Sequence, residues 1–372
     1  MFSKPFSMIL VYVVTIFNML VLLLPFLAVI VPFVQIDGNV ITIKDTIFHK
    51  IEFMFFMTMF AISFLMLVYL FLDYLFGFAV NSSLKNCVRY EKIKDYDFLT
   101  DLFDQVKNKF GQRDVKLYIK NSNEINAYAV SSLGKKCIVL TRGIVNHYSN
   151  CFDNPKDFLY ALRSIMGHEM SHLVNKDFLP TLLIIVNQKV TNLVTRFFRF
   201  VFSIIIRISI FMPFVARMSA RLTHDGFYLI NSIATYFNRV VVFGIYEFLR
   251  KFISRSIEYR CDMQSAKAFG GRNMAIALSK LGKSGYFTLF STHPNTKSRM
   301  KKVENVVIKD SIVRPRFFDS LSNYFSMLFL ITICLYFAKQ AQIDLYVRYY
   351  IREHELLHQK LSAMWSLISR FF

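Results

Sequence analysis

His168, Glu169 and His172 form the pattern with the clearest chemical meaning in this chain, a His-Glu-x-x-His pentapeptide. Two imidazoles four residues apart on a helix differ by only about 40° of rotation, so they can bind one metal ion together. The Glu169 carboxylate lies on an adjacent face, where it can take a proton from water without being a ligand itself. The pattern therefore predicts a zinc site with a general base.

A second copy of the pentapeptide, from His354 to His358, shows how weak the pattern is alone, since composition should produce it in about one such chain in a hundred. Charged and polar residues surround this copy, and no Asp, Glu or His follows it. A catalytic zinc needs a third protein ligand. The first copy instead lies among apolar residues suited to a buried helix, namely Ile165, Met166, Leu173 and Val174. We expect function at the first copy and leave the role of the second open.

The composition predicts a membrane protein, because 54% of the residues are hydrophobic and 41 are Phe, more than soluble globular proteins usually carry. Residues 8–34 contain no charge and residues 53–72 form a second apolar run, each long enough to cross a hydrocarbon core of about 30 Å. Residues 35–52 are expected to be a short loop between the two spans. A cleaved signal peptide is disfavoured, because the first run exceeds a signal core of about 7–15 residues and no cleavage pattern precedes the loop.

The distribution of basic residues predicts the orientation. Lys85, Arg89, Lys92 and Lys94 follow the second span, whereas the loop before it carries only Lys44 and Lys50. Residues beyond 80 are therefore expected in the cytosol. The net charge of +20 is scattered along membrane flanks, which favours contact with anionic lipid over nucleic acid. Five cysteines without a Cys-x-x-Cys pair predict no disulfide framework.

Residues 95–177 are expected to form a water-soluble unit. Apolar residues at spacings of three and four predict a helix over 98–110 that Gly111 stops. Alternation predicts a strand over 115–119, and the runs 125–130 and 137–141 are typical of a hairpin. The helix that carries the first pentapeptide is expected to begin at Asn154 as N-cap, followed by Pro155.

Residues 178–250 are again apolar, with Phe200–Ala216 and Phe227–Leu249 as expected membrane-embedded stretches. Arg207 interrupts the first and Arg239 the second, at a cost of at least about 2.5 kcal/mol each at bilayer depth unless the side chain snorkels or is paired. We favour a helical hairpin that dips into the membrane or packs on the other spans. The alternative is that these arginines face a wet cavity near the site.

Glu258 and Asp262 follow this hairpin and are four residues apart, hence on one helical face. One carboxylate can be the third metal ligand while the other bonds a ligand imidazole and fixes its tautomer. The alternative is an ordinary solvated helix face with Arg255 and Arg260. The upstream pentapeptide favours the site.

Several separated motifs together resemble the HtpX-type membrane metallopeptidases, relatives of the CAAX prenyl proteases. They are the N-terminal hairpin, Asn126–Ala129, Val139–Gly143, His168–Asp177, Glu258–Asp262 and Ser291–Pro294. The resemblance implies that His168, His172 and Glu258 bind one zinc ion, that Glu169 is the catalytic base and that Asp262 supports a ligand. It also implies a multi-pass protein of a bacterial cytoplasmic membrane, with its catalytic domain in the cytosol and a role in membrane-protein quality control.

The expected fold is an α-helical integral membrane protein with an α+β, zincin-like cytosolic domain made of the His-Glu-x-x-His helix and a small sheet. The chain departs from the family pattern at Cys261, where Ala is usual, and at Asn295, where Pro is common.

The expected organisation is a transmembrane hairpin (1–80), a first catalytic part (81–177), a membrane-embedded hairpin (178–250), a second catalytic part (251–310) and an added C-terminal segment (311–372). In that last segment, Tyr324–Ala338 is short for a span unless its neighbours extend it.

Polypeptides, among them membrane proteins, are the expected substrates. An extended substrate is expected to pair with the strand at Asn126–Val130, which would make sequence selectivity loose. His293 and Arg299 are candidate donors to the transition state, or packing and capping residues. The rival classes are a prenyl-protein protease and a metal-free membrane scaffold, and the oligomeric state stays open.

Overall fold

The computed structural model describes residues 8–9, 11–13, 15–17, 20, 34–37, 40–43, 45–132, 134–209, 211, 214–237, 240, 243–281, 295–343, 345 and 352. Of the described residues, those in Met1–Val21, Val68–Leu193 and Ile233–Met327 form one compact unit. Those in Leu22–Leu67, Val194–Ser232 and Leu328–Phe372 form the other. The residues of the first pentapeptide, together with Glu258 and Asp262, belong to the first unit.

The N-terminal part of the described chain contains a strand pair and a long helix. β1 (Val34–Asp37) pairs antiparallel with β2 (Val40–Ile43), and α3 runs from Asp45 to Phe76. The segment 35–52, predicted as a short loop between two spans, thus contains a strand pair and the start of α3. The β-branched residues of β2 favour extended backbone, and Gly38-Asn39 between the strands is a dipeptide typical of turns.

Among the described residues, two helices are long and apolar enough to cross a membrane, Phe55–Phe76 within α3 and Phe317–Gln340, which is α13. α13 is longer than the predicted apolar segment Tyr324–Ala338, so its neighbours do extend it. The first predicted span, residues 8–34, lies largely outside the described residues.

The expected water-soluble unit contains a mixed four-stranded sheet in the order β3-β4-β6-β5. Its strands are β3 (Cys87–Arg89), β4 (Lys116–Lys120), β5 (Ala127–Ser131) and β6 (Lys136–Thr141). β4 and β6 are parallel, whereas β3 pairs antiparallel with β4 and β5 with β6. The predicted hairpin is therefore confirmed as β5 and β6, and β5 lies at an edge of this sheet.

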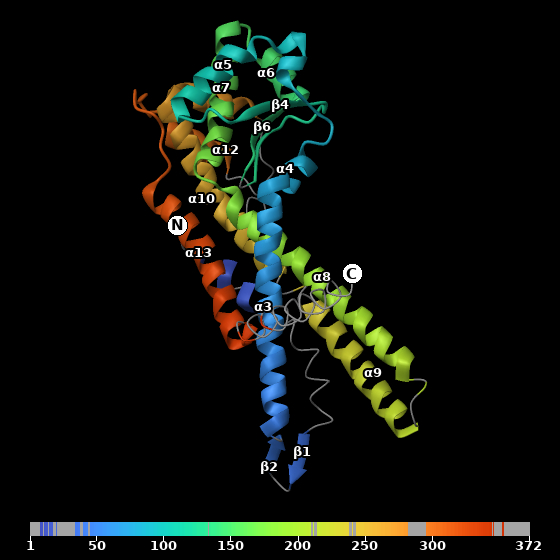
Figure 1. The fold of residues 1–372 in the computed structure, drawn as a ribbon. Coiled ribbons are helices and arrows are strands. Elements are labelled where there is room, and N and C mark those ends of the chain that lie inside the picture. Colours follow the sequence, from blue (N-terminus) through green and yellow to red (C-terminus); the bar gives the residue numbers. More distant parts are fainter. Residues whose placement is uncertain are drawn as a thin grey trace, which may run out of the picture. The chain divides into compact units, whose positions relative to one another are not determined.

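Helices pack on this sheet and enclose an apolar core (Figure 1). α4 (Phe78–Ser83) precedes β3, and two short 3₁₀ turns, Tyr90–Lys92 and Lys94–Tyr96, follow that strand. α5 then runs from Leu99 to Phe110. α6 (Arg142–Cys151) and α7 (Pro155–Val174) follow β6. The predicted end of α5 is confirmed, because Gly111 has φ of +61°, a left-handed conformation that glycine adopts without strain.

α7 is the helix that carries the first pentapeptide. The side chain of Asn154 accepts a hydrogen bond from the Lys156 amide at 3.0 Å, and Pro155 occupies the first helical position. The predicted start of this helix is thus confirmed. Its buried residues include Leu162, Ile165 and Met166, so the helix lies within the core.

The apolar region after α7 forms α8 (Phe178–Ser209), α9 (Phe214–Phe237) and α10 (Phe243–Phe269). The predicted stretch Phe200–Ala216 includes the end of α8 and the start of α9. Phe227–Leu249 likewise includes the end of α9 and the start of α10. α11 (Gly271–Lys280) and α12 (Thr296–Val303) follow.

Gly167 allows α10 to approach α7 closely. A β-carbon added at Gly167 would lie 2.7 Å from the ring of Phe269 and 2.8 Å from Oγ of Ser265, both on α10. The Ser265 hydroxyl also donates to the Ser164 carbonyl at 2.6 Å. Because His168 is the next residue after Gly167, this approach brings α10 beside the histidines of α7.

Candidate metal centre

α7 directs two imidazoles toward one point. His168 and His172 are one turn apart, and their Nε2 atoms are 3.2 Å from each other. His168 is buried, whereas His172 keeps partial exposure. Two ring nitrogens that face each other at this distance would repel as bare lone pairs, so the geometry favours a shared cation or a proton between them.

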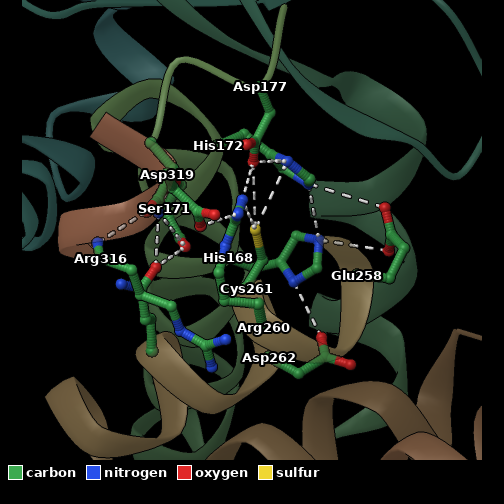
Figure 2. A network of polar contacts seen from close by, with 12 residues as sticks. His168, Ser171, His172, Asp177, Glu258, Arg260, Cys261, Asp262, Arg316 and Asp319 are labelled. Carbon is green, nitrogen blue, oxygen red and sulfur yellow. Dashed lines mark hydrogen bonds and ion pairs between the residues drawn. The ribbon is translucent and has the colours of Figure 1, made fainter. Parts of the chain in front are cut away.

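Glu258 on α10 completes the group. Its Oε2 lies 3.4 Å from Nε2 of His168 and its Oε1 lies 3.6 Å from Nε2 of His172 (Figure 2). These three residues, which the sequence placed together, offer ligand atoms that lie within 4.8 Å of one another. The carboxylate is buried among them, at 4% exposure.

The spacing of the three donors fits a tetrahedral zinc ion. Zinc bonds of about 2.0–2.1 Å at tetrahedral angles put neighbouring ligand atoms about 3.3 Å apart. The two ring nitrogens are 3.2 Å apart, and each lies 3.4 or 3.6 Å from a different oxygen of Glu258, which is close to that value. Two imidazoles and one carboxylate are also a donor set that catalytic zinc sites use, with one position left for water.

Asp262 contacts His168 on the side of the ring opposite the ligand nitrogen. Its Oδ1 lies 2.8 Å from Nδ1 of His168, which orients the ring with Nε2 toward the ligand group. Burial raises the pKa of Asp262, but the bonds from Arg299 and His168 outweigh burial, so the net shift is downward and the carboxylate is ionised. One of the two α10 carboxylates was predicted to take this position, and in the structure it is Asp262.

Arg299 on α12 binds Asp262 with two parallel hydrogen bonds, from Nε and Nη2 to the two carboxylate oxygens at 2.7 Å each. Nη2 also lies 3.2 Å from Oε2 of Glu258. The guanidinium is therefore bound to the carboxylates that surround the histidines, which favours an orienting role over donation to a substrate. His293, the other candidate, lies outside the described residues, as do His354 and His358.

Asp177 supports His172, a role that no sequence pattern predicted. Its Oδ2 lies 3.0 Å from Nδ1 of His172. Asp177 follows the end of α7 in the turn before α8, so no helical spacing links it to His172. The thiol of Cys261, the departure from the family pattern, lies 3.4 Å from the same nitrogen.

The site strongly favours positive charge. Burial by itself lowers the pKa of His168, but the Glu258 carboxylate and the bond to Asp262 outweigh it and raise the pKa to about 10. Protons therefore occupy the site when no cation does, and a metal ion has to displace them.

Burial also raises the pKa of Glu169, while the two histidines oppose this. A carboxylate with a raised pKa is a stronger base.

A cavity of about 360 Å³ opens beside the ligand group. Its lining comes from β5 and the residue before it, from α7 and the turn that follows, and from α8 and α10. The lining residues are Asn126, Ala127, Tyr128, Ala129, Ser131, His168, Glu169, His172, Leu173, Asp177, Phe178 and Glu258. Glu169 thus faces the same space as the ligands. Asn126, which was predicted to lie in the strand, directly precedes β5, and its backbone amide donates to Oγ1 of Thr141 at 3.1 Å.

Comparison with known protein families gives a match. Residues 99–307 match the family described as peptidase family M48, whose members include HtpX and the CAAX prenyl proteases. This range contains His168, Glu169, His172, Glu258, Asp262 and Arg299. Neither the curated proteins nor the solved structures give a match.

Proposed function

Because this chain belongs to peptidase family M48, a family of metallopeptidases, we propose that it is a zinc-dependent endopeptidase anchored in a membrane. The observation that carries the proposal is the convergence of Nε2 of His168, Nε2 of His172 and the Glu258 carboxylate at 3.2–3.6 Å, beside a cavity that Glu169 also lines. Bound zinc would supply Lewis-acid chemistry, which activates water and polarises a carbonyl.

The chain's own residues have separate tasks in this proposal. Asp262 and Asp177 hold the Nδ1 sides of His168 and His172, so that both Nε2 atoms face the cavity. Glu169 takes a proton from the attacking water at its carboxylate and passes it to the leaving amine. Its raised pKa suits both transfers, because a group that accepts and then releases a proton works best with a pKa near the operating pH.

The cavity supports an extended polypeptide as substrate. β5 forms the edge of the four-stranded sheet, and its residues Ala127–Ala129 line the cavity opposite α7. An edge strand binds an extended chain through main-chain hydrogen bonds, which depend little on the side chains of that chain. Loose sequence selectivity supports a role in degrading damaged membrane proteins at the cytosolic face.

The membrane location draws support from the apolar helices Phe55–Phe76 and Phe317–Gln340 and from the basic residues that follow the first of them. If the chain is integral, it should stay in the membrane pellet after an alkaline carbonate wash. Release into the supernatant would contradict this part of the proposal.

The catalytic proposal is tested with the full chain reconstituted in lipid nanodiscs and an unfolded soluble protein such as casein as substrate. We expect cleavage, its loss after chelation and its return with added zinc. The Glu169→Gln variant should bind zinc at the wild-type ratio but cleave nothing. Cleavage by that variant would remove Glu169 from its assigned role, and the absence of near-stoichiometric zinc in the wild type would favour a scaffold.

The same nanodiscs also separate the two kinds of peptidase in this family. We expect cleavage of the unfolded protein without any requirement for a lipid group on the substrate. Activity on a farnesylated CAAX peptide, with none on the unmodified peptide or on casein, would instead identify a prenyl-protein protease.

A further inference from the structure

The first turns of α13 carry buried polar side chains, although α13 is otherwise apolar. Asp319, Ser322, Asn323 and Ser326 are all below 9% exposure. These residues follow the range 99–307 that matches the peptidase family. A buried carboxylate such as Asp319 is unfavourable unless a cation pairs with it, so its partner indicates what the residue is for.

That partner is Arg260 on α10, which is also buried. Nη1 of Arg260 donates to Oδ2 of Asp319 at 2.6 Å, and Nη2 donates to Oδ2 of Asp177 (Figure 2). The planar guanidinium therefore bridges two carboxylates, one on α13 and one in the turn after α7. Arg suits this position because its donors have fixed directions that the ammonium group of Lys lacks.

The second carboxylate of this bridge is the one that supports a metal ligand, because Oδ2 of Asp177 lies 3.0 Å from Nδ1 of His172. The contacts thus run without a break from Asp319 through Arg260 and Asp177 to His172. We propose that Asp319 is a positioning residue for the metal centre, which acts through Arg260 and Asp177 to hold His172 as a ligand. The inference rests on the proposed zinc site.

A charge argument gives the direction of the effect. Asp319 shares the positive charge of Arg260 with Asp177. Without the negative charge of Asp319, Arg260 would pull more strongly on Asp177 and weaken its bond to Nδ1 of His172. That bond raises the basicity of the opposite nitrogen, so zinc should bind less tightly.

α13 also contacts the turn that carries Asp177 by a second route. The side-chain amide of Asn323 donates to the Asn175 carbonyl at 3.3 Å, and the backbone amide of Arg316 donates to Oδ1 of Asn175 at 3.4 Å. Asn175 is the C-cap of α7, two residues before Asp177. The turn is therefore fixed to the start of α13 both through the ion bridge and through its backbone.

The test is the zinc dissociation constant of the full chain in nanodiscs, measured by competition with a chromogenic chelator at one pH. Removing a direct partner of a ligand typically weakens metal binding about 10–100-fold. For Asp319→Asn, one contact further out, we expect a loss of about three- to tenfold with the far-UV circular dichroism unchanged. The matched control is Asp310→Asn, an exposed acidic residue nearby, which should bind zinc as the wild type does.

A double-variant cycle tests the route. Arg260→Lys keeps the charge but cannot bridge both carboxylates, so it should weaken zinc binding at least as much as Asp319→Asn. If Asp319 acts through Arg260, the double variant should bind zinc no more weakly than Arg260→Lys alone. Additive losses would overturn the route.

A merely structural role gives a different result, in which Asp319→Asn lowers the unfolding temperature while the zinc affinity of the folded protein stays at the wild-type value. That result overturns the inference. If the Asn variant does not fold, the folded Arg260→Lys variant decides, because it breaks the bridge between the two carboxylates, and a wild-type zinc affinity there overturns the inference equally. Failure of the proposed function differs from both, because the wild type itself would then bind no zinc.

Discussion

Oδ1 of Asp262 lies 2.8 Å from Nδ1 of His168, and both oxygens of this carboxylate also accept hydrogen bonds from Arg299. Each histidine of the ligand group therefore has its own carboxylate, since Asp177 has the same relation to His172. The two carboxylates come from different elements, α10 and the turn after α7. They contact the Nδ1 atoms of the rings, on the side away from the Nε2 atoms that face Glu258.

Replacing Asp262 by Asn should weaken zinc binding about 10–100-fold, because an amide neither orients the His168 ring nor raises its basicity as a carboxylate does. The measurement is chelator competition on the purified full chain. Asp153→Asn, an exposed site before α7, is the matched control. Wild-type affinity in the Asp262 variant would show that His168 does not depend on this contact.

Replacing Gly167 by Ala should separate α10 from α7, since the new methyl group would meet Phe269 and Ser265 at 2.7–2.8 Å. We expect a stability loss of about 1–3 kcal/mol from overpacking, together with weaker zinc binding as Glu258 moves away from the histidines. Thermal unfolding and zinc titration measure the two effects.

The control for the Gly167 variant is Gly244→Ala, also in a helix, where an added β-carbon meets nothing within 4 Å. This variant should be neutral, or more stable by up to about 1 kcal/mol from helix propensity. Equal effects at the two glycines would contradict the proposed close approach.

The zinc-free protein should lose stability as the pH rises from about 6.5 to about 10. His168 has its pKa raised from 6.5 to about 10 in the fold, so the folded state binds more protons than the unfolded state in that window. The contribution is fully present below pH 6.5 and is lost as the pH rises through the folded value. Unfolding temperatures of chelated samples measure this, and in His168→Gln the slope should be smaller.

The C-terminal pentapeptide should not bind catalytic zinc. The double variant His354→Ala/His358→Ala should keep the wild-type zinc content and the wild-type cleavage rate, because charged and polar residues flank these histidines, whereas the first copy lies among apolar residues. Loss of one equivalent of zinc in this variant would assign a second site to the tail.

Local patterns predicted the helix and the donors of the site, but not the contacts between distant elements. Asn154 with Pro155, the stop at Gly111 and the hairpin of β5 and β6 follow from local backbone preferences, so the sequence sufficed for them. The pairing of Asp177 with His172 depends on how a turn folds back, and the bridge from Arg260 to Asp319 joins residues 59 positions apart. The alternative of a solvated helix face would have left Arg260 exposed, whereas the residue is buried.

The most direct test of the central claim is X-ray absorption spectroscopy at the zinc edge of the full chain. Coordination by His168, His172 and Glu258 predicts only nitrogen and oxygen neighbours, at about 2.0–2.2 Å, with the scattering of two imidazoles. Because Cys261 lies 3.4 Å from His172, the rival group His172, Asp177 and Cys261 would give a sulfur neighbour at about 2.3 Å and only one imidazole. That second spectrum would contradict the account.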